Sequence, residues 1–293
     1  MQPAVRLDWN MRYLLILLAL ATGAGAAARA AGAAPVPKDL VKAELLADVA
    51  SVKPGEEFTL GVLLKIKPKW HIYWKYPGDA GLPTAIKWKL PAPSAQQQPE
   101  VRFPFPVRFD QPGDVVGYGY KDEVLLTARV KAPDGPVGSN QEFAADVSWL
   151  VCEEICIPGK ATVKLSIPLA EKTTAANQAL FGKWVAQLPQ PVDSSIVKIA
   201  GLEQMGQREL QAKVEWPAGQ PIKDVQWFPL PPKGSGVEDA QTKSAGNQSI
   251  LSFALVPMPK ELLKMQFLVT YTDSNGKRQG VEFSENLPTP LSK

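Results

Sequence analysis

The sequence predicts an all-β protein: an immunoglobulin-like β-sandwich followed by a second, smaller β-sandwich domain, with a short helical connector joining them. The chain has 293 residues, which is long enough for two domains. It contains 28 Pro and 22 Gly, and these residues separate short apolar runs, as in proteins built of many short strands. Several runs alternate apolar and polar residues, which is the pattern of a strand with one buried face.

The N-terminus has the pattern of a secretory signal peptide, which we assign to residues 1–34. Arg6 and Arg12 place positive charge before a short apolar run at 13–21, and Ala28-Arg29-Ala30 fits the cleavage pattern of small residues. The run is much shorter than the roughly 20 apolar residues of a membrane span, and the small-residue tract favours cleavage over an uncleaved anchor. We expect localisation in the periplasm and a processed chain that is not membrane-spanning.

Residues 38–170 are expected to form the first sandwich. Its clearest strand has Ala161, Val163, Leu165 and Ile167 alternating with polar residues. The strands that the pattern predicts are 41–46, 58–66, 85–90, 124–130, 144–151 and 161–167. Short strands and turns at this spacing are typical of an immunoglobulin-like sandwich.

Residues 171–193 are expected to form the helical connector, because their apolar residues have helical spacing. Thr173 or Thr174 is a candidate N-cap, and Pro189 ends the segment. The spaced apolar residues are Leu180, Phe181, Trp184, Val185 and Leu188.

Residues 194–287 are expected to form the second β-sandwich domain. Its best local signal is Asp273-Ser-Asn-Gly276, a hairpin turn. Residues 231–248, rich in Gly, Ser, Lys and Gln, are predicted to be a mobile loop. The strands predicted here are 196–199, 210–216, 225–230, 250–256, 265–272 and 278–283.

Charge and histidine content exclude several classes of function. The net charge is only +3, and Lys and Arg are scattered without a basic run, so no nucleic-acid partner is expected. His71 is the only histidine. A His-rich metal site is therefore excluded, and any hydrolase triad would need His71 itself. A structural role for His71 is favoured over tuning a thiol or ligating a metal.

Cys152 and Cys156 are the candidate catalytic residues. Both neighbouring segments have strand patterns, so a turn between them would bring the two sulfurs together across a hairpin. Disulfides persist in an oxidising compartment such as the periplasm. The closed loop is so short that the bond would contribute only about 2 kcal/mol of stability. A bond with so small a contribution is better suited to reversible opening than to a structural role. From the residues alone, a redox pair and a plain structural disulfide remain equal alternatives.

The negative charges of Glu153 and Glu154 disfavour a nearby thiolate, which is the attacking species in disulfide exchange. The pair is therefore expected to react slowly with random disulfides and well with a docked partner. No cofactor is expected. Two thiolates can hold Cu(I), whereas Zn²⁺ needs about four ligands. A copper-handling periplasmic binding protein and a two-domain interaction protein with a structural disulfide are the alternative functions.

Three motifs together resemble a known family. They are the aromatic string 70–84 (WHIYWKYPGDAGLPT), Tyr118-Gly119-Tyr120, and the stretch 149–159 (WLVCEEICIPG). Over about residues 40–168 the chain resembles the N-terminal periplasmic domain of the thiol:disulfide interchange protein DsbD family, in its ScsB-like branch (suppressor of copper sensitivity). In the aromatic string, Trp70, Tyr73 and Trp74 pack beside the cysteines, meet a partner or pack in the core, and the core is favoured for at least one.

The resemblance implies an immunoglobulin-like fold and a protein-disulfide reductase type of thiol:disulfide oxidoreductase. In the family, electrons pass from a membrane-embedded domain, through a thioredoxin-like domain, to oxidised periplasmic proteins. Thioredoxin-like periplasmic proteins and a membrane-embedded electron donor are therefore the expected partners. Cys156 would form the mixed disulfides, and Cys152 would resolve them. A cap over the pair would be formed by residues 109–113 with Phe109 as the shield, or by Tyr118 or Tyr120.

Two departures from the family pattern bear on this expectation. Only three residues separate the two cysteines, fewer than in the best-known members. The sequence also stops after the second β domain, so we expect the transmembrane and thioredoxin-like parts on separate chains, or a narrower role for this protein.

Overall fold

The computed structural model describes residues 39–288, apart from 112, 114, 193–196, 220, 221 and 260. The predicted signal peptide at 1–34 lies outside the described residues, as do Pro112 of the predicted cap and residue 194, where the second domain is expected to begin. Within the described residues, no helix has the length and apolarity needed to cross a membrane.

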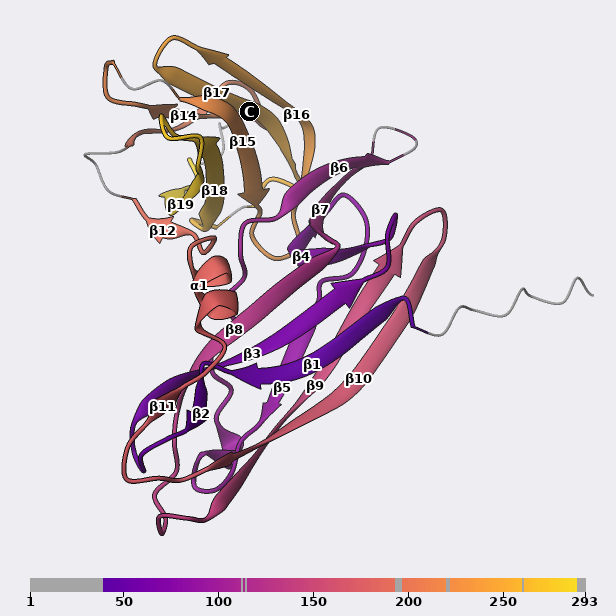
Figure 1. The fold of residues 1–293 in the computed structure, drawn as a ribbon. Coiled ribbons are helices and arrows are strands. Elements are labelled where there is room, and N and C mark those ends of the chain that lie inside the picture. The colour runs from indigo at the N-terminus through magenta and orange to yellow at the C-terminus, as the bar shows by residue number, and fades with distance from the viewer. Residues whose placement is uncertain are drawn as a thin grey trace, which may run out of the picture. The chain divides into compact units, whose positions relative to one another are not determined.

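The chain is all-β, as predicted, and its first part contains two main sheets (Figure 1). A three-stranded sheet has the order β1-β3-β8, with strands β1 (Val41–Ala47), β3 (Glu57–Ile66) and β8 (Glu123–Lys131). A six-stranded sheet has the order β10-β9-β4-β7-β6, with β5 paired to β9. Its strands are β4 (His71–Gly78), β5 (Ala85–Lys89), β6 (Val107–Gln111), β7 (Val115–Lys121), β9 (Asn140–Cys152) and β10 (Cys156–Pro168). Both sheets contribute side chains to one apolar core, which makes this part a sandwich.

The sandwich core holds several large side chains at almost no exposure. Leu60 and Leu64 of β3 and Trp74 of β4 are each 0% exposed, and fully burying one such side chain stabilises the fold by about 1.5–3 kcal/mol. Trp70 and Tyr73 are also buried. The expectation that at least one residue of the aromatic string lies in the core is therefore confirmed.

The β9–β10 hairpin is longer than the alternating pattern predicted. Each strand has 13 residues, and β10 begins at Cys156 instead of near Ala161. The predicted alternation is present, since Ala161, Val163 and Leu165 are less exposed than the polar residues between them. The extra pairing continues up to Cys152 and Cys156, and so places both cysteines at the end of the hairpin.

The predicted connector contains a helix over only part of its length, and the start of this helix was predicted wrongly. Helix α1 (Gln178–Val185) has Asn177 as its N-cap residue. Thr173 and Thr174 are engaged elsewhere: the Thr173 hydroxyl accepts a hydrogen bond from the Lys53 N–H (3.0 Å), and Thr174 lies in β11 (Thr174–Ala175), paired with β2 (Val49–Ser51). Long-range pairing overrides the local capping preference here. Phe181 and Trp184 are buried, as their spacing predicted.

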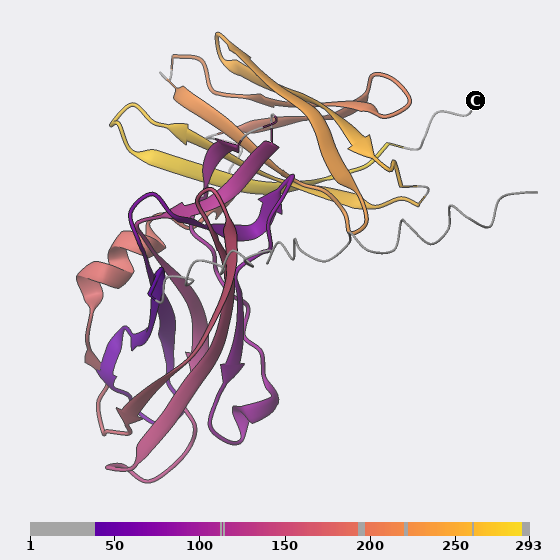
Figure 2. The same cartoon turned by 90° about the vertical axis from the view of Figure 1, so that its right-hand side faces the viewer.

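The second part is also built of two sheets, which Figure 2 shows as two layers. One has the order β12-β19-β18-β15 and the other β13-β14-β17-β16. Their side chains share a second core that includes Trp216, Trp227 and Phe267. The strands are β12 (Gln190–Pro191), β13 (Lys198–Gln204), β14 (Glu209–Glu215), β15 (Lys223–Leu230), β16 (Gly236–Ala245), β17 (Gln248–Val256), β18 (Lys264–Thr272) and β19 (Arg278–Asn286).

The prediction of a mobile loop at 231–248 is wrong over most of its length, because β16 occupies it and pairs with β17. As a sheet-edge strand with mostly exposed side chains, β16 accommodates the polar composition that suggested a loop. The predicted turn before β19 is confirmed: Asp273 Oδ1 accepts hydrogen bonds from the N–H groups of Asn275 (2.9 Å) and Lys277 (3.0 Å). Lys38–Lys293 form one compact unit, and the domain boundaries at 170 and 194 stay predictions.

Candidate functional site

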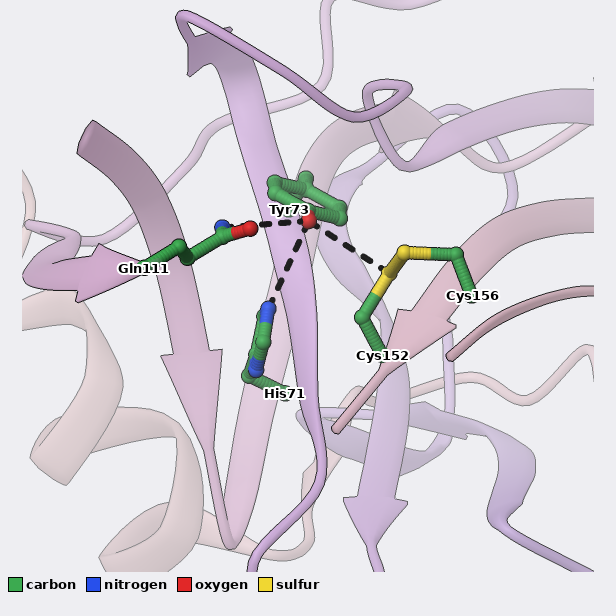
Figure 3. The surroundings of a disulfide bond; sticks show 5 residues. All are labelled: His71, Tyr73, Gln111, Cys152 and Cys156. Atoms are coloured by element: carbon green, nitrogen blue, oxygen red, sulfur yellow. Dashed lines mark hydrogen bonds between the residues drawn. A yellow bond between two sulfur atoms is a disulfide. The ribbon is translucent and has the colours of Figure 1, made fainter. Parts of the chain in front are cut away.

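The two cysteines form a disulfide at the end of the β9–β10 hairpin (Figure 3). Cys152 is the last residue of β9, Cys156 is the first of β10, and their Cα atoms lie 4.2 Å apart. They face each other in the strand register, and the loop 153–155 connects them with one hydrogen bond from the Glu153 N–H to the Ile155 carbonyl (3.2 Å). The predicted proximity across a hairpin is therefore confirmed.

The two sulfur-bearing residues differ in exposure. Cys152 is 1% exposed, whereas Cys156 belongs to the exposed residues of the hairpin end. Ile155, in the loop between them, is 63% exposed. A molecule approaching from solvent therefore meets Cys156 and the apolar side chain of Ile155 first, while Cys152 faces the protein interior.

A small apolar cluster separate from the main core surrounds Cys152. Its buried members are Tyr73, Phe109 and Cys152, with Leu150 packed against them. The cluster is assembled from three strands of one sheet, since Tyr73 lies on β4, Phe109 on β6 and Cys152 on β9. The His71 ring also packs on Phe109, with ring centroids 4.2 Å apart.

Polar contacts converge on the Tyr73 hydroxyl at this cluster (Figure 3). The hydroxyl donates to Cys152 Sγ at 3.4 Å. Gln111 Nε2 donates to the hydroxyl oxygen at 3.4 Å, and His71 Nε2 lies 3.4 Å from the same oxygen. The disulfide is thus connected through one tyrosine to two further polar side chains.

Burial keeps the histidine of this network neutral. It lowers the pKa of His71 to about 4, because the imidazolium would lose its hydration, and the positive charge of Lys121 acts in the same direction. The Lys121 ammonium also lies 5.5 Å from the centre of the Phe109 ring. At neutral pH the ring of His71 therefore brings no positive charge to the disulfide.

Comparison with known proteins gives the family of this part of the chain. Residues 38–168 match the family model described as thiol:disulfide interchange protein DsbD, N-terminal. These residues are a DsbD N-terminal domain. No curated protein sequence matches the chain.

One solved structure extends the likeness beyond residues 38–168. The N-terminal periplasmic domain of ScsB from Proteus mirabilis has a TM-score of 0.67 at 17% identity, covering 88% of this chain and 98% of that one. The fold is therefore shared over both sandwiches. The titin Ig tandem domains A164-A165 (TM-score 0.20, 11% identity, 85% and 97% covered) and the E. coli chaperone DraB (0.18, 11%, 84% and 97%) also match.

The structure separates the three candidate shields of the DsbD N-terminal domain. Phe109 is 7% exposed and packs beside Cys152. Tyr118 and Tyr120 belong to the main core, where Tyr118 packs on Tyr76 (ring centroids 6.2 Å apart) and the Tyr120 hydroxyl donates to the Pro104 carbonyl (2.8 Å). Shielding of the disulfide by any of the three residues stays a prediction. Of the three, Phe109 is the one that lies beside Cys152.

Sequence reasoning considered Tyr73 beside the cysteines and His71 as a residue that tunes a thiol, but favoured neither role. It included Gln111 in the predicted cap 109–113 without giving its side chain a role. One local signal was present: His71 and Tyr73 are two residues apart on a strand, so their side chains lie on the same face. Gln111 gave no local signal, because only the pairing of β6 with β7 brings it near Tyr73.

The described residues contain no group of three or more His, Cys, Asp or Glu arranged to hold a metal ion. In this part of the chain the copper alternative therefore depends on the two cysteine sulfurs of the DsbD N-terminal domain.

Proposed function

We propose that the protein is a periplasmic thiol–disulfide interchange module that relays electrons through Cys152 and Cys156 to or from partner proteins. One observation carries the proposal: a disulfide with one buried and one exposed cysteine ends a hairpin of a DsbD N-terminal domain. A bond that only stapled the fold would gain nothing from this asymmetry, whereas exchange requires one sulfur that a partner can reach.

The exchange begins at Cys156. A partner thiolate attacks Sγ of Cys156, a new S–S bond forms, and the Cys152–Cys156 bond breaks with its electron pair leaving on Sγ of Cys152. The second thiol of the partner then attacks the mixed disulfide and releases Cys156. The partner dithiol is oxidised to a disulfide, and the pair here gains two electrons and two protons.

The reverse sequence delivers the electrons. The Cys156 thiolate attacks a client disulfide, and Cys152 then attacks Sγ of Cys156 in the mixed disulfide and releases the reduced client. The partners are thioredoxin-like periplasmic proteins and a membrane-embedded electron donor. The signal-peptide pattern at 1–34 supports the periplasmic assignment.

Phe109 acts as the shield in this proposal. Its ring packs against Tyr73 and Cys152 on the buried side of the disulfide, and it lies on β6, whose hairpin with β7 includes the predicted cap. A docked partner that moves this hairpin would expose the sulfurs, whereas small oxidants in solution meet a covered Cys152.

The reduction potential of the Cys152–Cys156 pair tests the proposal. The full chain is equilibrated with glutathione or dithiothreitol buffers, and its fold is checked in both redox states. Structural disulfides in secreted proteins usually have potentials below about −300 mV. We expect a value above this limit with the fold intact when reduced. A value well below this limit would contradict the redox relay and favour an interaction protein with a structural disulfide.

A further inference from the structure

We propose that His71 and Gln111 are positioning residues that direct the hydroxyl proton of Tyr73 at Sγ of Cys152 when that sulfur becomes a thiolate. The inference rests on the proposed function, in which Cys152 carries the electron pair released by attack on Cys156. Tyr73 would then stabilise the leaving sulfur, and the other two side chains would hold the hydroxyl in the orientation that this requires.

The hydrogen-bonding capacity of the four groups leads to this assignment. A tyrosine hydroxyl has one proton to donate and two lone pairs that accept. The Gln111 amide nitrogen only donates, and it lies 3.4 Å from the Tyr73 oxygen. His71 Nε2, at 3.4 Å, fills the second lone pair when it carries the proton of the neutral ring. Of the three groups around the hydroxyl, Sγ of Cys152 is then the one acceptor left.

The arrangement responds to the redox state of the sulfur. A disulfide sulfur is a weak acceptor, so an unprotonated Nε2 of His71 would compete with Sγ for the Tyr73 proton while the pair is oxidised. A thiolate accepts far more strongly, because hydrogen bonds to charged groups are the stronger class. The proton then points to Sγ, and His71 donates from Nε2. A neutral ring allows both arrangements, and burial keeps it neutral at neutral pH.

Burial increases the contribution of the Tyr73–Cys152 hydrogen bond to thiolate stability. Tyr73 and Cys152 are each 1% exposed, and His71 is 7% exposed. A thiolate released there has little water around it, and a buried charge is costly unless hydrogen bonds replace its hydration. The nearby charged groups are Lys121, over the Phe109 ring, and the exposed Glu153 and Glu154 of the hairpin loop.

Strand pairing holds the positioning groups in place. The backbone of His71 pairs with Cys152 in the β4–β9 ladder and with Lys121 in the β4–β7 ladder. Gln111 pairs with Val115 in the β6–β7 hairpin. Because these residues lie on paired strands, the three groups converge before the disulfide opens, which is the condition for a preorganised site.

The ionisation of the Cys152 thiol tests the proposal. It is measured from the ultraviolet absorbance of the thiolate against pH in the full chain carrying Cys156→Ser, after subtracting the spectrum of the chain that lacks both cysteines. We expect Tyr73→Phe to lower the acid dissociation constant of the thiol about tenfold. His71→Phe and Gln111→Leu should lower it less, in the same direction. Tyr271→Phe, a buried tyrosine of the second core, should leave it unchanged.

Rescue separates positioning from packing. His71→Phe keeps a ring against Phe109 but has no N–H, whereas His71→Gln provides a side-chain N–H donor and should restore much of the lost ionisation. An unchanged dissociation constant in Tyr73→Phe would overturn the proposal. So would an effect of Tyr73→Phe that neither His71→Phe nor Gln111→Leu shares. Gln111 is only half-buried, so its variant remains informative if a change at His71 prevents folding.

A second readout distinguishes failure of this inference from failure of the proposed function. At a pH above the range in which the Cys152 thiol ionises, a tenfold lower acid dissociation constant lowers the equilibrium constant for reduction of the pair by glutathione about tenfold. At a pH below that range, the equilibrium constants of the variants and the wild type converge. Equal redox equilibria in Tyr73→Phe and wild type at high pH would contradict the network alone. A wild-type pair as hard to reduce as a structural disulfide would contradict the proposed function, whatever its thiol ionisation.

Discussion

The Tyr73 hydroxyl donates a hydrogen bond to Sγ of Cys152 at 3.4 Å, across 79 residues of sequence. Both side chains are almost fully buried. The contact joins β4 to the end of β9 and reaches the disulfide from its interior side, opposite the exposed Cys156. The two sulfurs therefore have different chemical surroundings, and the predictions below follow from that difference.

The exposure difference predicts different reactivity for the two single-cysteine variants. With oxidised glutathione as the probe, Cys152→Ser, which leaves Cys156, should form a mixed disulfide at least about tenfold faster than Cys156→Ser, which leaves the buried Cys152. Mass spectrometry of samples quenched with acid gives both rates. Equal rates, or a faster reaction of Cys156→Ser, would contradict the assignment of Cys156 as the cysteine that attacks partners.

Replacing the proposed shield should open the site. We expect Phe109→Ala to speed reduction of the disulfide by dithiothreitol several-fold, because the ring that packs on Cys152 is removed. Stability should fall by about 3 kcal/mol, the lower end for such a change, since the cluster is small. Phe253→Ala in the second core is the matched control: it should cost stability without speeding reduction. If both variants speed reduction equally, general loosening explains the effect, not shielding.

Opening the disulfide should cost little stability. The bond joins cysteines only four positions apart, and closing so short a loop contributes about 2 kcal/mol in the chain-entropy model. Urea denaturation of the oxidised and reduced full chain measures this difference. Unfolding of the reduced chain, or a loss well above that figure, would indicate a structural staple.

The buried histidine predicts a specific pH dependence of stability. The pKa of His71 is about 4 in the folded protein, below its ordinary value of 6.5, so between these values the unfolded chain binds the extra proton. Stability from this group is complete above about pH 6.5, falls as the pH drops towards 4 and levels off below it. The full loss is about 3 kcal/mol.

Urea denaturation of wild type and His71→Phe across this pH range isolates the histidine from the carboxylates, which titrate in both proteins. The difference in stability between the two should change in favour of His71→Phe as the pH falls from 6.5 to 4. A constant difference would show that His71 is protonated in the folded protein as readily as in the unfolded chain.

Local patterns in the sequence were sufficient for the features that depend on neighbouring residues. The alternation of Ala161, Val163 and Leu165 predicted a strand, and the Asp273–Gly276 turn is present. The same reasoning located the cysteine pair, because two strand patterns with a short turn between them must form a hairpin. The resemblance of 70–84 and 149–159 to the DsbD N-terminal domain added the family, which the match over 38–168 bears out.

Features that depend on distant segments were predicted less well. The polar stretch 231–248 contains a strand because β17 offers it a pairing edge, and Thr174 pairs with β2 instead of capping the helix. Which aromatic residue shields Cys152 was left open among Phe109, Tyr118 and Tyr120, and Gln111 of the predicted cap was given no contact of its own. The reason is the same in each case: periodicity and turn chemistry describe contacts within a segment, whereas pairing between strands decides which segments meet.

The sequence by itself therefore determined the all-β class, the cysteine pair and its place at a hairpin, because these follow from interactions between residues close together in the chain. Only the tertiary structure decided that Cys152 is buried and Cys156 exposed, and that His71, Gln111 and Sγ of Cys152 converge on the Tyr73 hydroxyl. That environment is made by the pairing of β4, β6, β7 and β9 in one sheet, and the register between distant strands is set by the packing of the whole core.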